Sequence, residues 1–183
     1  MDNYQNKLVF VGHVGAGKTT AIRSISDVPP VSTEMPMSSE QIDGKLTTTV
    51  ALDYSTVELD DGELLHIYGV PGQKYLDFMW PMVCHGAMGI IVLVNACSPQ
   101  KLTYAALMLE EFSKLAPHAS FAVGVTRSDL VPSFRLDAFR NDLITKGFRL
   151  PVVKVDAREP EQVDFLVKIL LSSRFVGSQI ASA

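Results

Sequence analysis

The chain has 183 residues, of which 47% are apolar and 20% charged, so it is long enough to bury the core of one domain. Its net charge of −4 lacks the basic excess that sequence-independent binding to a phosphate backbone needs, so we expect no nucleic-acid partner. The two cysteines, Cys84 and Cys97, have no metal-ligand spacing and predict free thiols in a reducing compartment. We expect a single domain over 1–183, with 174–183 as a flexible tail.

Neither end of the chain predicts a membrane anchor. The N-terminal letters MDNYQNK contain no basic segment followed by an apolar run, and the C-terminal letters GSQIASA offer no cysteine for a prenyl group. The longest apolar run, 87–96, is about half the length of a membrane helix and predicts a buried strand. We expect a cytoplasmic protein that would reach a membrane only through a partner protein.

Continuous apolar runs recur along the chain and predict strands that are covered on both faces, as in a mainly parallel sheet. These strands are predicted over 8–11, 48–59, 64–68, 89–95, 121–125 and 152–155. Helices are predicted over 19–26, 103–116, 137–146 and 161–173, mainly from apolar residues at helical spacing. The alternation predicts an α/β fold with a sheet of about six strands and helices on both faces.

Two segments depart from this alternation. Asp61-Gly62 is a hairpin signal. We therefore expect the strands on either side of it to pair and to include one antiparallel edge strand. The stretch 26–46 is rich in proline, serine and threonine without periodicity, which predicts a long mobile loop. A loop of that length in a compact domain is usually functional or disordered.

The letters GHVGAGKTT, at 12–20, directly follow a predicted strand and open a predicted helix. This is the Walker A pattern, in which glycines let backbone N–H groups converge on phosphate oxygens at a helix N-terminus. Lys18 would reach the terminal phosphates, and the Thr19 hydroxyl would bind Mg²⁺. The predicted phosphate-binding residues are Val14, Gly15, Ala16, Gly17, Lys18, Thr19 and Thr20.

A second constellation, TRSD at 126–129, lies at the end of a predicted buried strand, on the edge where ligands bind in open α/β sheets. The Asp129 carboxylate can accept two hydrogen bonds, which matches the N1–H and amine of guanine but not adenine. From these residues alone, an Asp that caps a surface turn explains the pattern equally well.

The motifs GHVGAGKT, TTTVALDY, VPGQ, TRSD and DAR follow one another in the order and spacing of Ras-like small GTPases. TTTVALDYSTVEL and IYGVPGQKYLDFMW resemble more narrowly the bacterial MglA-like branch, especially the GTPases encoded in actinobacterial conservons. The resemblance covers nearly the whole chain. It implies a P-loop NTPase fold and a molecular switch that binds GTP and GDP with Mg²⁺.

The resemblance also assigns roles to residues outside the Walker A loop. Thr126, Arg127 and Asp129 match the guanine-specifying motif, although Arg127 replaces its usual lysine. The DAR segment matches the last motif and adds Asp156, Ala157 and Arg158, with the Ala157 N–H meeting the guanine carbonyl. Thr49, or Thr48 as the alternative, would close onto Mg²⁺ and the γ-phosphate.

The segment Gly69-Val70-Pro71-Gly72 departs from the Asp-x-x-Gly of most Ras-like proteins, because Gly69 replaces the acid that holds a Mg²⁺-bound water. MglA-like proteins share this departure. Gly72 belongs to the predicted nucleotide site. Gln73 matches the residue that orients the attacking water, and the rival interpretation is a solvated glutamine at a helix start.

Turnover is expected to be slow. Val14 replaces a glycine that leaves space for the glutamine and an arginine finger in classical Ras-like proteins. The sequence has no arginine between Arg23 and Arg127, so neither switch segment supplies a finger. We therefore predict a GTPase with slow intrinsic hydrolysis that needs a partner protein.

The partner would be a regulator or effector that binds at 34–54 and 70–85. Aromatic residues and methionines crowd the second of these segments, where interface and core packing are equally good explanations. In the resembling family the partner is often a Roadblock-type homodimer. Two rival functions are a nucleotide-locked, non-catalytic signalling module and an ATP-using phosphotransferase, which the lack of an arginine-rich lid disfavours.

Overall fold

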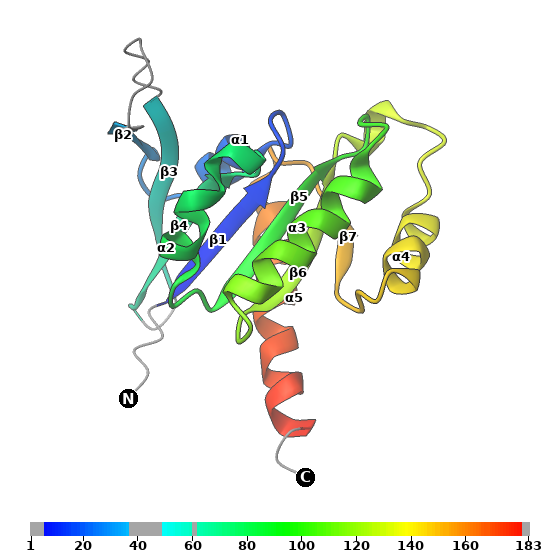
Figure 1. Cartoon of the computed structure of the whole chain (residues 1–183). Helices are drawn as coiled ribbons and strands as arrows, with labels where there is room; N and C mark the ends of the chain where they lie inside the picture. Colours follow the sequence, from blue (N-terminus) through cyan, green and yellow to red (C-terminus); the bar gives the residue numbers. More distant parts are fainter. Residues whose placement is uncertain (1–5, 37–48, 60–61, 181–183) are drawn as a thin grey trace.

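The computed structural model describes residues 6–36, 49–59 and 62–180 (Figure 1). These residues form one seven-stranded sheet with the order β2-β3-β4-β1-β5-β6-β7. The strands are β1 (Lys7–Gly12), β2 (Val31–Pro36), β3 (Thr49–Glu58), β4 (Leu64–Pro71), β5 (Gly89–Asn95), β6 (Ser120–Thr126) and β7 (Val152–Lys154). The α-helices are α1 (Lys18–Ile25), α2 (Trp80–Cys84), α3 (Lys101–Leu115), α4 (Leu136–Thr145) and α5 (Pro160–Ile180), and the 3₁₀ helices are η1 (Lys74–Met79) and η2 (Ser128–Leu130).

The predicted α/β fold is confirmed. Strands β4, β1, β5, β6 and β7 are parallel, so their carboxyl ends meet at one edge of the sheet. One core layer packs α2, α3 and α4 on one face, and a second packs α1 and α5 on the other (Figure 1). All six residues of β1 are buried, as continuous apolar runs predict for a central strand.

The sheet has one strand that the sequence did not predict. Val31–Pro36 form β2 inside the stretch predicted to be a loop. Strand β3 is antiparallel to both of its neighbours, as predicted for that strand, but β2 rather than β3 lies at the edge of the sheet. Pro36, which cannot donate a hydrogen bond, ends β2, and an edge strand tolerates proline. Residues 37–46 of the predicted loop lie outside the described residues.

Both predicted glycine turns are present, and the last helix is longer than predicted. The β3–β4 hairpin is present, with Gly62 at φ 80° and a hydrogen bond from Leu59 N–H to the Glu63 carbonyl. Gly147, at φ 95°, follows α4 as predicted. Helix α5 continues to Ile180, through most of the stretch predicted to be a tail.

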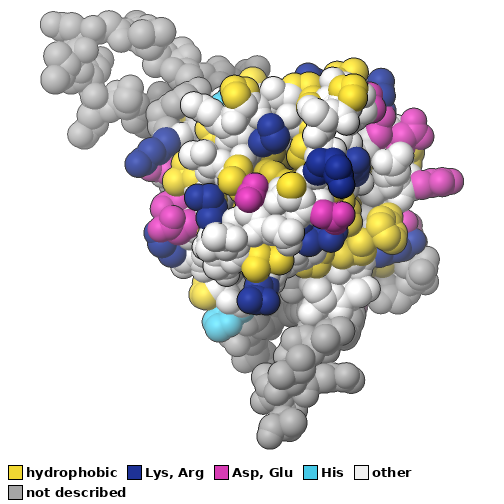
Figure 2. All heavy atoms as spheres, turned by 90° about the vertical axis from the view of Figure 1, so that its right-hand side faces the viewer, with side chains coloured by type: hydrophobic (Ala, Val, Ile, Leu, Met, Phe, Trp, Pro, Cys, Tyr) yellow, Lys and Arg dark blue, Asp and Glu magenta, His cyan; other side chains and the backbone are white. Residues whose placement is uncertain are grey.

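Cys84 is buried, Cys97 is exposed, and both are free thiols. Within the described part of the chain, we find no helix with the length and apolar character that crossing a membrane requires. Figure 2 shows the side of the molecule that carries α4. Lys and Arg side chains are interspersed there with Asp and Glu side chains rather than gathered into one basic stripe.

Candidate nucleotide-binding site

The glycine-rich stretch forms a loop between β1 and α1, at the carboxyl edge of the parallel strands. Gly17 caps α1 with φ 96°, a left-handed conformation that favours glycine. Gly12 has no room for a side chain, because an added Cβ would lie 2.4 Å from the Leu93 carbonyl oxygen. Ala16 is buried, and its N–H donates to the His13 carbonyl at 3.1 Å. The predicted strand, loop and helix are therefore in place for a phosphate.

Lys18 is held inside this loop. Its Nζ donates to the Gly12 carbonyl at 2.7 Å and to the His13 carbonyl at 3.2 Å. Burial lowers the pKa of Lys18 from 10.5 to about 8, and the Asp53 carboxylate partly opposes this effect. A phosphate in the loop would favour the charged ammonium.

The side chain of Thr19 meets a carboxylate that the sequence analysis did not assign. The Thr19 hydroxyl donates to Asp53 Oδ2 at 2.5 Å, and Asp53 is only 7% exposed. Asp53 comes from the middle of β3, far from the loop in sequence. A hydroxyl and a buried carboxylate are oxygen ligands that suit Mg²⁺.

Asp53 also stands next to the position of the missing acid. Gly69 of β4 is directly opposite Asp53 in the antiparallel pair, and a Cβ on Gly69 would lie 3.1 Å from Asp53 Oδ2. A side chain on Gly69 would in addition lie 2.7 Å from Ile22 of α1. The neighbouring strand thus supplies a carboxylate where Gly69 has none.

The signal for Asp53 was present in the sequence. It is a charged residue in the middle of a strand, and alternation places it on the face opposite that of the buried Leu52, under α1.

Thr49 lies on the same strand, at its first residue, where the backbone pairs with Pro36. The side chain of Thr49 and the whole of Thr48 lie outside the described part of the structure.

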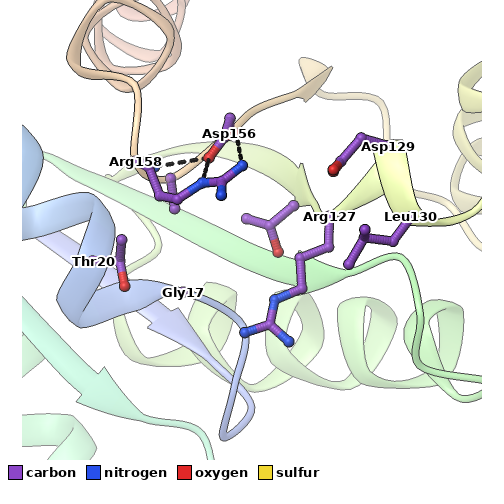
Figure 3. Close-up of a pocket in the computed structure, with 9 residues that line it drawn as sticks. Gly17, Thr20, Arg127, Asp129, Leu130, Asp156 and Arg158 are labelled. Carbon is purple, nitrogen blue, oxygen red and sulfur yellow. Dashed lines mark hydrogen bonds and ion pairs between the residues drawn. The ribbon is translucent and has the colours of Figure 1, made fainter.

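The residues predicted to bind the base line one cavity of about 310 Å³ (Figure 3). Figure 3 shows that three parts of the fold contribute these residues: the start of α1, the end of β6 with η2, and the loop that precedes α5. The lining consists of Gly17, Thr20, Thr126, Arg127, Asp129, Leu130, Asp156, Ala157 and Arg158. The fold therefore brings together residues from three distant parts of the chain beside the glycine loop.

Within this cavity, Thr126 ties the base side to the phosphate side. Its hydroxyl is buried and donates to the Ala16 carbonyl at 3.0 Å, with the Val94 carbonyl at 3.3 Å. The hydroxyl thus fixes the glycine loop against the ends of β5 and β6.

The next residues present side chains to the cavity. Among the described residues, Arg127 is the one non-glycine residue with a positive φ, 55°. Such a conformation is uncommon and is found often at functional sites. This turn leads into η2, from which Asp129 contributes an exposed carboxylate to the cavity wall.

Asp156 and Arg158 form a two-pronged ion pair, with Nη2–Oδ2 at 2.6 Å and Nε–Oδ1 at 2.9 Å (Figure 3). Asp156 Oδ1 also accepts the Arg158 N–H, and Asp156 N–H donates to Gln162 Oε1. The Arg158 guanidinium lowers the pKa of Asp156 to about 2. The carboxylate of Asp156 therefore shapes the loop around Ala157.

Gly72 and Gln73 lie beside the start of the glycine loop. The Gly72 N–H donates to the Gly12 carbonyl at 3.1 Å. Gln73 precedes η1, and its side-chain oxygen Oε1 is buried with no hydrogen-bond partner among the described residues. A buried acceptor of this kind is available to a water or ligand.

The aromatic and methionine-rich segment that follows Gln73 divides into two sets. Leu76, Met79 and Trp80 belong to the core, whereas Phe78 and Met82 are 57% and 55% exposed. Val14, on the glycine loop, is 63% exposed. Both of the earlier explanations, core packing and an exposed apolar surface, therefore apply to different members of the segment.

A buried parallel strand, a glycine loop with lysine and threonine, and a helix that starts at that loop define the class of P-loop nucleotide-binding proteins. The chain belongs to the family described as conserved hypothetical ATP-binding proteins, whose family model matches residues 10–148.

A curated relative is the uncharacterized protein MJ1339 of Methanocaldococcus jannaschii. It is 29% identical over 90 residues, which cover 49% of this chain and 51% of the relative. The chain thus matches about half the length of that relative. The comparisons support nucleotide binding.

Proposed function

We propose that this chain is a Ras-like guanine-nucleotide switch of the MglA-like branch, which binds GTP and GDP with Mg²⁺ and hydrolyses GTP slowly. The observation that carries the proposal is the shared cavity, in which Asp129 and the loop around Ala157 stand next to Gly17 of the glycine loop. Phosphates in the loop would leave the base in this cavity.

Asp129 favours guanine over adenine. Its carboxylate can accept hydrogen bonds from N1–H and the exocyclic amine of guanine, whereas adenine presents an acceptor at N1. Leaving such a group unpaired costs about 1–3 kcal/mol. The family description names ATP, so the base is the first property to test.

The direct experiment is to denature the purified protein and identify the released nucleotide by chromatography. We expect GDP or GTP. Release of ADP or ATP would overturn the guanine assignment. If the purified protein carries no nucleotide, its affinities for guanine and adenine nucleotides are measured and compared instead.

Thr19 and Asp53 would hold Mg²⁺, and the resemblance adds Thr49 as a further ligand. Mg²⁺ commonly binds one or two carboxylates together with phosphate oxygens and waters, which fits a hydroxyl and a single buried acid. The described residues contain no cluster of three or more His, Cys, Asp or Glu side chains that would hold a metal alone. When bound, the ion would neutralise charge that develops on the phosphates.

Lys18 and Gln73 are the proposed catalytic residues. The Lys18 ammonium would lie against the terminal phosphates and stabilise the transferred group. The unpartnered Gln73 Oε1 would accept a hydrogen bond from the attacking water and orient it. Gly72, next to Gln73, would border the phosphate side, where its N–H holds the Gly12 carbonyl at the start of the glycine loop.

Val14 should limit intrinsic turnover. In the proposed switch its exposed, branched side chain obstructs the space that Gln73 and a partner's arginine need. We expect Val14→Gly to raise the single-turnover rate of GTP hydrolysis about 3- to 10-fold, roughly the effect of 1 kcal/mol on a barrier. A wild-type rate that is already high without a partner, and unchanged in the variant, would contradict this role.

Nucleotide affinity should fall as the pH rises through about 8. Burial lowers the pKa of Lys18 to about 8, and binding to the phosphates requires the charged ammonium. Below that pH the ammonium is present before binding, and above it each pH unit should weaken binding up to tenfold. Titration with GDP between pH 7 and 9 tests this, with Lys18→Arg as the control whose affinity should not follow pH.

A second candidate function is a nucleotide-locked module that signals without turnover, which Val14 favours. It predicts bound guanine nucleotide and no hydrolysis in wild type or in Val14→Gly, with or without a partner. Measurable hydrolysis that Gln73→Ala abolishes would exclude it.

For the partner, we propose a regulator or effector, such as a Roadblock-type homodimer, that binds at 34–54 and 70–85. The exposed Phe78 and Met82 support the second segment as a contact surface, since aromatic residues and methionine are enriched in interface cores. A cytoplasmic location, with membrane recruitment only through that partner, accompanies this proposal.

A further inference from the structure

The turn that carries Gln73 is anchored on both of its sides. The Gly72 N–H donates to the Gly12 carbonyl, and the indole Nε1 of Trp80 donates to the Pro71 carbonyl, each at 3.1 Å. The Gln73 carbonyl in turn accepts the Leu76 N–H at 2.9 Å, which starts η1. The backbone of the turn is therefore tied to the glycine loop and to the indole.

Trp80 connects this turn to α3. Its side chain is 3% exposed, and its ring packs on Phe112 with ring centroids 4.8 Å apart at an angle of 40°. The indole N–H thus comes from a ring that packing already fixes. The donor cannot move away from Pro71 unless the contact with α3 also changes.

The side-chain oxygen of Gln73 has no such support. Gln73 Oε1 is buried without a hydrogen-bond partner among the described residues, so no polar contact of its own holds it in place. Its position is then set by the backbone of the turn, and through Pro71 by Trp80.

We propose that Trp80 is a positioning residue for Gln73 in GTP hydrolysis. The inference rests on the proposed function, in which Gln73 orients the attacking water. Trp80 touches neither nucleotide nor water in this account, and acts only by fixing the turn two residues before Gln73.

Trp80→Phe tests the proposal, because it keeps an aromatic ring against Phe112 and removes the N–H. We expect the single-turnover rate of GTP hydrolysis to fall about 3- to 10-fold, the effect of one neutral hydrogen bond. The affinities for GDP and for a non-hydrolysable GTP analogue should stay within about twofold of wild type, because the glycine loop is untouched. Asp142→Asn, an exposed change on α4 away from this turn, should leave the rate unchanged.

A double-mutant cycle separates positioning from a general structural role. In a Gln73→Ala background, Trp80→Phe should have no further effect on the rate, because the residue it positions is gone. An equal loss in both backgrounds would overturn the proposal. So would an unchanged rate in Trp80→Phe, or a loss of nucleotide affinity without a loss of rate.

Hydrogen exchange of the Gly72 amide gives a second measurement that does not depend on turnover. Faster exchange in Trp80→Phe, at an unchanged melting temperature, supports the anchoring, and unchanged exchange contradicts it. A wild-type chain that hydrolyses no GTP would overturn the proposed function itself, which is a different result from normal hydrolysis that ignores Trp80.

Discussion

Asp53→Asn should weaken the binding of Mg²⁺ to the nucleotide-loaded protein about 10- to 100-fold, the range found when partners of a metal site are removed. The amide keeps the size of the side chain but loses the negative charge that, in our proposal, faces the ion with Thr19. Fluorescent GDP release measured over a Mg²⁺ titration reports this affinity. In excess EDTA the variant and wild type should release GDP at similar rates.

Two further variants show whether the effect belongs to this position. Asp77→Asn removes an exposed carboxylate and should leave the Mg²⁺ titration unchanged. The double variant Asp53→Gly, Gly69→Asp moves the acid to the opposite strand, and it removes the Asp53 Cβ that a side chain at position 69 would contact. This variant should recover part of the Mg²⁺ affinity. Wild-type Mg²⁺ dependence in Asp53→Asn would contradict the assignment.

Asp129→Asn should lower the affinity for GTP about 100-fold or more, since a guanine would lose two hydrogen bonds to a charged acceptor, each contributing about 1.5–3 kcal/mol. The same change should favour xanthine nucleotides. The asparagine amide can donate to the C2 carbonyl that xanthine has in place of the guanine amine. Competition of GTP, XTP and ATP against a fluorescent nucleotide measures both effects.

The control for this substitution is Asp142→Asn, an exposed carboxylate on α4 outside the cavity, which should bind GTP like wild type. If Asp129→Asn left GTP affinity unchanged, Asp129 would be the turn-capping residue that the sequence alone also allowed. If Asp129→Asn weakened the binding of GTP without strengthening the binding of XTP, the Asp129 carboxylate would affect the shape of the cavity rather than contact the base.

Most of the fold could be predicted because its central strands are long apolar runs, which tertiary context rarely overrides. Strand β2 could not. Its six residues, VSTEMP, show no regular alternation of apolar and polar side chains, and its backbone pairs with the neighbouring strand β3. The local sequence carries no trace of that neighbour, so propensity favoured a loop.

The candidate site divides in the same way. The glycine loop is predictable because its motif is contiguous, and the fold brings Asp129 and Ala157 beside it, as the resemblance implied. Asp53 is not predictable by motif, since its relation to Gly69 exists only across an antiparallel pair. The tie from Thr126 to Ala16 likewise depends on strands meeting at one edge of the sheet.

Calorimetric titration of nucleotide-free wild-type protein with GTP and with ATP, each in excess Mg²⁺ and in EDTA, tests the guanine assignment and the metal site together. We predict that GTP binds at least about 100-fold more tightly than ATP, since a site built to pair with one base strongly rejects another, and that EDTA weakens GTP binding. Equal or tighter binding of ATP would contradict the guanine assignment, and Mg²⁺-independent binding of GTP would contradict the role given to Thr19 and Asp53.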